Sequence, residues 1–265
     1  MTATGDNWAT GDAYESYMGR WSRPLARTFV GWLRSDHRGT WLEIGCGTGA
    51  LTRAICEVGE PASVVACDRS ESFVSYAREA VDDSRVFFAV ASAENPPGAA
   101  HAFDYVVSGL LLNFVSDPSG VLRLMAERAR RGGVVGAYVW DYGEGMSFLR
   151  CFWDEAVALD AAAADFDEAY RFPLCRREIL SSLFVSTGLQ DVAVEGLEVL
   201  THFENFDDFW TPFLRGTGPA PSYAAALSPE RQQELRRRLA RRLKRESDGS
   251  IRLKARAWAA RGVAG

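Results

Sequence analysis

The first half of the chain alternates short apolar runs with segments whose apolar residues recur at helical spacing. Between the last two runs, residues 121–130 carry apolar side chains on one helical face, the pattern of an amphipathic helix. Strands that alternate with helices predict right-handed βαβ units and a parallel sheet. The predicted strands cover residues 40–44, 63–67, 86–90, 103–108 and 134–140.

The pattern after Trp140 is less regular. We expect helices over 148–164 and 174–186, with Gly188 ending the second one. Residues 191–201 and 250–257 alternate as strands do. An insertion separates these two strands: a short helix over 205–214, a Gly/Pro-rich loop over 215–222, and a long helix over 228–246 with Ser228 as N-cap and Pro229 at its first position.

A strand that runs into three glycines is the most informative stretch of the sequence. Residues 40–50 read TWLEIGCGTGA, with glycines at 45, 47 and 49. Glycines at this spacing let the backbone turn sharply and approach a ligand closely, because no Cβ intervenes. The helix expected over 50–57 points its first N–H groups toward whatever lies on the loop. The stretch therefore predicts a ligand-binding loop.

An acid at the end of the second strand suggests which ligand binds there. Asp68 follows strand 63–67 and lies 19 residues after Gly49. A carboxylate in this place accepts hydrogen bonds from both ribose hydroxyls of a nucleoside. The loop and Asp68 together predict a nucleoside-cofactor site.

The glycine spacing leaves two cofactor classes open. Gly45 to Ala50 satisfies the dinucleotide pattern G-x-G-x-x-G/A, which keeps a nicotinamide or flavin cofactor possible. Two features point away from it. Glu43 lies inside a strand that should be buried, where a carboxylate is costly unless it is hydrogen-bonded or charge-compensated. The third glycine also falls at the fifth place of the pattern instead of the sixth.

The combined pattern h-h-E-h-G-x-G-x-G resembles motif I of the class I S-adenosylmethionine-dependent methyltransferases, in particular the small-molecule type 11 family of ubiquinone and menaquinone biosynthesis. The resemblance extends over residues 14–262. It implies a doubly wound α/β fold with a seven-stranded, mainly parallel sheet whose last strand is antiparallel. It also implies a single domain, with an N-terminal lid helix (1–35), a cofactor-binding core (36–141) and substrate-cover helices (142–190 and 202–248).

The resemblance assigns roles to residues around the loop. Glu43 steadies the loop near the methionine end of the cofactor, and Asp68 holds the ribose. Residues 91–97 are similar to the family's adenine-binding G-D-A-E-x-L-P, with Ser92 in place of the acid as a weaker acceptor. Arg23 reaches the methionine carboxylate, with Arg20 as the alternative. The full implied cofactor set is Tyr14, Met18, Arg23, Glu43, Gly45, Cys46, Gly47, Gly49, Asp68, Arg69, Ser92, Ala93 and Leu110.

The acceptor side has a weaker signature. Methyl transfer is an in-line displacement, so the protein mainly aligns nucleophile, methyl and sulfur and excludes water. A base is needed only when the nucleophile keeps its proton. Asp141 and Tyr142 leave a strand at its C-terminal end, Asn113 lies in the loop after the fourth strand, and His202 is a possible base or a structural histidine. We expect a small, aromatic or apolar acceptor, methylated at oxygen or nitrogen.

The sequence is also compatible with functions other than methyl transfer. A nicotinamide-dependent oxidoreductase would need a hydride-transfer base such as Tyr-x-x-x-Lys, and the only lysines are Lys244 and Lys254. A relative of the same fold could use the cofactor for other chemistry, or bind the nucleoside without catalysis. The C-terminal aromatic residues could line an apolar pocket or form ordinary core.

Composition favours a soluble enzyme. The chain has 265 residues, of which 47% are hydrophobic and 25% charged, enough for a substantial core. The net charge of −5 disfavours nucleic acid. The basic helix over 228–246 lacks interleaved aromatic residues and carries a leucine stripe, as a surface helix does. We expect a small-molecule acceptor, no nucleic-acid or membrane partner, and a monomer or a homodimer.

The N-terminus and the cysteines indicate the compartment. The start, MTATGDNWAT, has no basic region followed by an apolar core, and no apolar run reaches transmembrane length. The five cysteines are odd in number and form no CxxC pair, which argues against a disulfide framework or a zinc site. We therefore expect a cytoplasmic protein without a metal.

Overall fold

The computed structural model describes residues 18–33, 38–214 and 218–265. Contacts divide the chain into two compact units. The sheet unit comprises Ser22–Trp140, Leu174–Leu197 and Ala257–Gly265. The helical unit comprises the described end of Met1–Trp21, together with Asp141–Pro173 and Glu198–Arg256. Each is described below by itself.

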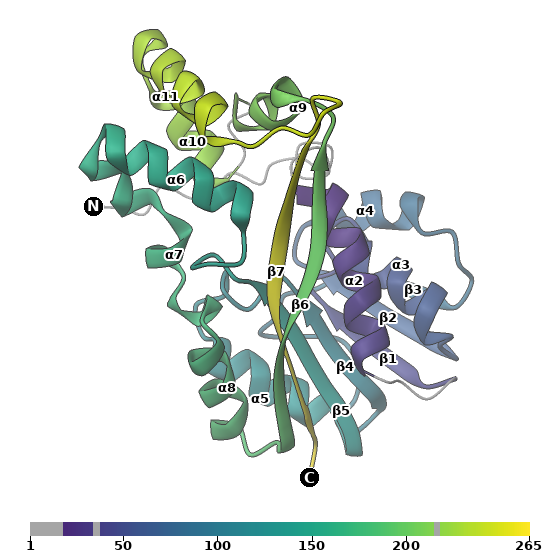
Figure 1. Cartoon of the computed structure of the whole chain (residues 1–265). Coiled ribbons are helices and arrows are strands. Elements are labelled where there is room, and N and C mark those ends of the chain that lie inside the picture. Colours follow the sequence, from purple (N-terminus) through teal and green to yellow (C-terminus); the bar gives the residue numbers. More distant parts are fainter. Residues whose placement is uncertain (1–17, 34–37, 215–217) are drawn as a thin grey trace. The chain divides into compact units, whose positions relative to one another are not determined.

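A seven-stranded sheet in the order β3-β2-β1-β4-β5-β7-β6 is the framework (Figure 1). The pairs β1/β2, β1/β4, β2/β3 and β4/β5 are parallel, whereas β7 runs antiparallel to β5. This confirms the predicted doubly wound α/β fold with an antiparallel last strand. The strands are β1 (Thr40–Ile44), β2 (Ser63–Asp68), β3 (Val86–Val90), β4 (Phe103–Gly109), β5 (Ala129–Trp140), β6 (Gln190–Phe203) and β7 (Ile251–Val263).

Helices between the strands are started by local signals that the sequence carries. Ser70 caps α4 by accepting from the Phe73 amide, and Asp117 caps α5 by accepting from the Gly120 amide. Gly188, at φ 81°, follows α8 as predicted. The helices are α2 (Arg20–Leu33), α3 (Ala50–Ala54), which continues as a π-helix (Ile55–Gly59), α4 (Glu71–Ala80), α5 (Pro118–Arg128) and α8 (Arg177–Ser186).

Two strands extend well beyond the ranges that the sequence pattern predicts. β5 begins at Ala129, ahead of the predicted Val134, because Ala129 already pairs with Phe103 before a register shift. β7 continues past the predicted end at Ala257 to Val263, because it pairs with β5 along the whole of Val134–Trp140. The added part of β5 includes the exposed Arg130, Arg131 and Gly132, so no apolar alternation marks it. The added part of β7 is buried or half-buried on both faces, which also removes the alternation.

The helical unit contains short helices joined by tight turns. The predicted loop over 215–222 is wrong for its second part, because α10 starts at Pro219 directly after Gly218. Pro219 and Pro221 fit the first helical turn, which needs no N–H donors, and alanines follow. The elements are α6 (Ser147–Leu159), a 3₁₀ turn (Ala161–Phe166), α7 (Glu168–Arg171), a 3₁₀ turn (Pro173–Cys175) that leads out of the unit, α9 (Phe206–Trp210), a 3₁₀ turn (Thr211–Leu214), α10 (Pro219–Ala226) and α11 (Pro229–Arg242).

Aromatic side chains form the core of the helical unit. Phe152 stacks on Phe213 with ring centroids 4.5 Å apart, and Trp21 packs on Phe148 at 4.6 Å. All four rings are buried. Of the two readings of the C-terminal aromatic residues, core packing therefore accounts for these rings.

The basic helix α11 is charge-compensated within the helical unit. Arg231 pairs with Asp160 at 2.7 Å, and Arg242 pairs with Asp154 at 2.6 Å. Its leucine stripe faces inward, with Leu235 and Leu239 fully buried. The pairs favour the surface-helix interpretation over a binding face for anions. Within the described residues, no helix combines the length and the apolarity needed to cross a bilayer.

A carboxyl group is buried in the same unit. Glu168 is 3% exposed, and its carboxylate accepts a hydrogen bond from Trp153 Nε1. Burial raises the pKa of Glu168 to about 7, against the opposing effects of hydrogen bonds and of Arg150. Folding therefore favours the protonated form of this side chain.

This burial predicts a pH dependence of stability. Because the folded pKa lies above the unfolded one, the stabilising effect of protonation is complete below about pH 4.5 and disappears as the pH rises through about 7. The cost is at most about 1.4 kcal/mol per pH unit for one group. Glu168→Gln should flatten the fall of the unfolding midpoint between these values, measured by thermal melts. An equally steep fall in the variant would contradict the assignment.

Candidate functional site

The glycine loop follows β1 and is fixed to the end of β2. The amides of Gly45 and Cys46 both donate to the Cys67 carbonyl, at 2.8 and 2.9 Å. Gly45, Gly47 and Gly49 have φ values of 79°, 50° and 85°, in the left-handed region where a side chain is strained. The glycines are therefore required by the backbone path of the loop.

The Asp68 carboxylate is held against this loop. One oxygen accepts from the Gly47 amide at 3.0 Å, and the other accepts from the Ser70 amide at 2.9 Å. Asp68 is the last residue of β2, so the carboxylate lies at the C-terminal ends of the parallel strands. Open α/β sheets bind ligands at this edge. The structure brings together the loop and the acid that the sequence singled out.

Glu43 lies beneath the loop as a buried carboxyl group. It is 1% exposed, and the Thr52 hydroxyl donates to its Oε2 at 2.5 Å. Burial raises the pKa of Glu43 to about 8, the hydrogen bond from Thr52 opposes this, and the nearby Asp68 adds to it. Sequence reasoning missed Thr52. The available signal was a hydroxyl placed early in the helix that follows the loop.

The segment after β3 is tied to the same edge of the sheet. The Ala91 amide donates to the Asp68 carbonyl at 2.9 Å, and the Asn95 amide donates to the Ser92 carbonyl at 3.1 Å. Ser92 and Ala93 are half-buried. The segment therefore leaves the sheet next to Asp68, where an adenine-binding segment would have to lie.

The loop after β4 is strained and contains an unpaired donor. Leu110 has φ 57°, which costs a non-glycine residue about 1–2 kcal/mol. Its amide donates to the Tyr138 carbonyl at 2.8 Å, which holds this conformation. Asn113 Nδ2 is buried and has no hydrogen-bond partner among the described residues. Unpaired buried donors and strained backbone are features of ligand sites.

The N-terminal candidates are only partly described. Tyr14 lies outside the described residues, Met18 is buried in the helical unit, and Arg23 is exposed on α2. The guanidinium of Arg20 is bound by both oxygens of Asp208 at 2.9 and 3.0 Å, and it also lies over two aromatic rings. These contacts engage Arg20 within the helical unit and count against it as the carboxylate-binding arginine.

The cysteines are present as free thiols, and four of the five are buried. Cys46 lies in the glycine loop at 5% exposure. Burial and the neighbouring carboxyl groups raise the pKa of its thiol well above the ordinary range. It therefore stays protonated at neutral pH, as expected of a small residue in a tight turn. Arg69, the cofactor candidate that follows Asp68 at the end of β2, is exposed.

The acceptor-side candidates have different surroundings. Asp141, 4% exposed, accepts from Arg256 Nε at 2.8 Å and from a terminal nitrogen of the same guanidinium at 2.6 Å. Tyr142 is buried, with its ring 5.8 Å from that of Phe172. His202 is exposed on β6. These candidates belong to the helical unit and Asn113 to the sheet unit. The two hydrogen bonds from Arg256 tie the Asp141 carboxylate to one guanidinium.

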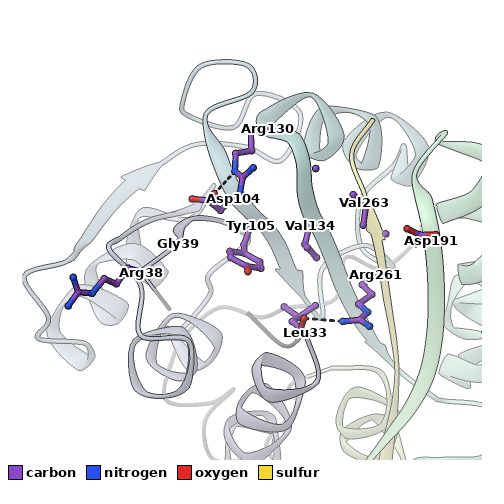
Figure 2. Close-up of a pocket in the computed structure, with 12 residues that line it drawn as sticks. Leu33, Arg38, Gly39, Asp104, Tyr105, Arg130, Val134, Asp191, Arg261 and Val263 are labelled. Carbon is purple, nitrogen blue, oxygen red and sulfur yellow. Dashed lines mark hydrogen bonds and ion pairs between the residues drawn. The ribbon is translucent and has the colours of Figure 1, made fainter. Parts of the chain in front are cut away.

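A polar pocket of about 510 Å³ lies at the opposite ends of the strands (Figure 2). Arg130 donates to Asp104, and Arg261 donates to the Leu33 carbonyl at 3.0 Å. Gly39, which precedes β1, also lines it, and none of the candidate cofactor or acceptor residues does. This pocket is therefore separate from the glycine loop. Across residues 18–33, 38–214 and 218–265, no three His, Cys, Asp or Glu side chains are grouped so as to hold a metal ion.

Comparisons with known proteins agree with this arrangement. Residues 42–136 match a family model described as a methyltransferase domain. The malonyl-[acyl-carrier protein] O-methyltransferase of Acetivibrio thermocellus is 26% identical over 124 residues, 46% of this chain and 43% of that protein. The demethylmenaquinone methyltransferase of Shouchella clausii is 36% identical over 98 residues, 36% of this chain and 42% of that protein.

A solved structure extends the likeness in fold. The phosphoethanolamine N-methyltransferase 2 of Haemonchus contortus, in complex with phosphomonomethylethanolamine and S-adenosylhomocysteine, has a TM-score of 0.58 at 20% identity, covering 96% of this chain and 56% of that one. The chain spans less than half the length of the curated relatives it matches. The matches confirm the resemblance that motif I carries.

The loop geometry predicts unequal effects of two alanine substitutions. A Cβ at Gly45 would lie 2.7 Å from Leu111 Cδ2, whereas a Cβ at Gly47 would meet no atom within 4 Å. Gly47→Ala should cost only the left-handed backbone, about 1–2 kcal/mol. Gly45→Ala should cost about 1–2 kcal/mol more through overpacking.

Chemical denaturation of both variants checks this order. Gly132→Ala is the matched control, because Gly132 also has positive φ and open space around it, away from the loop. Equal losses for Gly45→Ala and Gly132→Ala would show that contact with Leu111 is unimportant.

Proposed function

We propose that this chain, whose residues 42–136 match a methyltransferase domain, is a class I S-adenosylmethionine-dependent methyltransferase that binds S-adenosylmethionine and transfers the methyl group to a small molecule. The observation that carries the proposal is the Asp68 carboxylate at the end of β2, fixed by the Gly47 amide beside three left-handed glycines. This arrangement offers a nucleoside both a ribose acceptor and a loop that a ligand can approach closely.

The described residues fit the cofactor. The space beside Gly47 is open, and each Asp68 oxygen has lone-pair capacity left after its single backbone bond. In this proposal Asp68 accepts from the ribose hydroxyls, and Ser92 and Ala93 border the adenine. Glu43 and Arg23 serve the methionine end. The bound cofactor supplies an electrophilic methyl group on a positively charged sulfur.

The acceptor is the less defined half of the proposal. One curated relative is named for demethylmenaquinone, which supports a small apolar or aromatic acceptor, and the other is named as an O-methyltransferase of malonyl-[acyl-carrier protein], which supports methylation at oxygen. We retain methylation at oxygen or nitrogen. We assign Asp141, Tyr142, His202 and Asn113 to the acceptor side. Asn113 can donate or accept a hydrogen bond but does not act as a base. Asp141 is held by Arg256, and we assign it to orienting the acceptor. Any proton transfer then falls to His202 or to solvent.

The remaining parts of the proposal concern the compartment, the domain organisation and the oligomeric state. The free cysteines are compatible with a reducing, cytoplasmic environment. A single catalytic domain with lid and cover segments remains a prediction, and so does a homodimer.

Calorimetric titration with S-adenosylmethionine, S-adenosylhomocysteine and NADH in parallel tests the cofactor. We expect both sulfur nucleosides to bind and NADH to give no heat of binding. Binding of NADH alone would overturn the proposal in favour of an oxidoreductase. Transfer of a labelled methyl group to screened small molecules then separates an enzyme from a protein that only binds the nucleoside.

Asp68→Ala tests the ribose contact. Loss of hydrogen bonds to a charged group should weaken S-adenosylmethionine binding by about 1.5–3 kcal/mol. Asp82→Ala is the control, since Asp82 is exposed in the connection between α4 and β3. Unchanged affinity in Asp68→Ala, with a normal melting curve, would remove the ribose assignment.

A further inference from the structure

The contact between Thr52 and Glu43 is buried and direct. Thr52 lies on α3, the helix that follows the glycine loop, and it is fully buried. Glu43 is the residue before the last of β1, and its Oε2 accepts from the Thr52 hydroxyl at 2.5 Å. Strand and helix are thus joined beneath the loop by one side-chain hydrogen bond.

Among the described residues, the titratable groups that interact with Glu43 are one carboxyl group and three thiols, without a compensating cation. Asp68 faces it from β2, and the thiols that interact with it are Cys46 in the loop, Cys56 on the π-helix and Cys67 on β2. Within the described part of the chain, no arginine or lysine forms an ion pair with Glu43. A second ionised carboxylate here must therefore be stabilised by Thr52 or by a ligand.

We propose that Thr52 is a positioning residue that acts through Glu43: its hydroxyl holds the Glu43 carboxylate toward the loop, and binding of the positively charged end of the cofactor makes Glu43 release its proton to solvent. This inference rests on the proposed function, since it needs the cofactor. It adds a residue that the sequence analysis did not select and a proton that the binding reaction must release.

The direction of the effect follows from the charges. In the free protein burial raises the pKa of Glu43 to about 8, so this carboxyl group holds its proton at neutral pH. S-adenosylmethionine carries a sulfonium and an α-ammonium group, whereas S-adenosylhomocysteine has only the ammonium. Positive charge near Glu43 favours the ionised form. S-adenosylmethionine should therefore release the larger fraction of a proton.

Thr52 makes the mechanism testable without loss of shape. Thr52→Val replaces the hydroxyl by a methyl group and leaves Glu43 without its hydrogen-bond donor. The ionised form of Glu43 then loses its hydrogen-bond partner. Both the proton release on binding and the preference for S-adenosylmethionine over S-adenosylhomocysteine should therefore fall. Thr52→Ser keeps the donor and should restore both. Thr28→Val is the matched control, because Thr28 is an exposed helical threonine whose hydroxyl donates to the Pro24 carbonyl of its own helix.

The experiment is calorimetric titration of the full chain with both ligands between about pH 6 and 8.5, in buffers of different ionisation enthalpy, which yields the protons released. The α-amino group of both ligands titrates near pH 8, so Glu43→Gln provides the background. In wild type, S-adenosylmethionine affinity should rise with pH by up to about tenfold per unit, more steeply than S-adenosylhomocysteine affinity. Thr52→Val should lower the ratio of S-adenosylmethionine affinity to S-adenosylhomocysteine affinity several-fold at neutral pH.

The outcomes separate the two claims. If neither ligand binds wild type, the proposed function fails and this inference fails with it. If both ligands bind with equal proton release in wild type and Glu43→Gln, the proposed function stands and the inference is overturned. The same holds if Thr52→Val keeps the wild-type pH profile. Should Thr52→Val fail to fold, Thr52→Ala takes its place, because it also removes the hydroxyl that donates to Glu43 and adds no atom to the buried site. A wild-type pH profile in Thr52→Ala would overturn the inference.

Discussion

The ends of β1 and β2 are joined by a few backbone hydrogen bonds on which the candidate site depends. Two successive loop amides donate to the carbonyl of Cys67, and the next residue, Asp68, takes the amide of Gly47. These bonds require backbone angles that glycine adopts without strain. The same few atoms thus fix the loop, orient the carboxylate and leave one side of the loop open.

The structure buries two carboxyl groups, and their desolvation opposes folding. Glu43 and Glu168 are both almost fully buried, and in both cases desolvation outweighs the hydrogen bonds that each receives. A core made only of apolar side chains would avoid this cost. For Glu43 our proposal gives a reason for its position beneath the loop, because a ligand with positive charge would offset the penalty on binding. Glu168 lies in a different unit, where its hydrogen bond with Trp153 joins the start of α7 to α6.

Local sequence patterns predicted the parts of the site that depend on neighbouring residues. The glycines and the acid after strand two follow from the backbone requirements of one βαβ unit, so a single sequence displays them. Contacts between distant segments are not visible in this way. Arg20 is engaged by Asp208, and Asp141 by Arg256, 115 residues later. Thr52 is near in sequence, but its selection needs the knowledge that α3 turns that hydroxyl toward a buried carboxyl group. The helix at Pro219 was missed because Gly and Pro mark both loops and helix starts.

The burial of the thiols gives this chain one preferred point for chemical labelling. Four of its cysteines are buried, whereas Cys151 on α6 is partly accessible, and the nearby Arg242 counteracts part of the rise that burial causes in the pKa of its thiol. A maleimide dye should therefore attach first at Cys151, in the helical unit and away from the glycine loop in sequence. A fluorophore there reports on the helical unit while the cofactor loop stays unmodified.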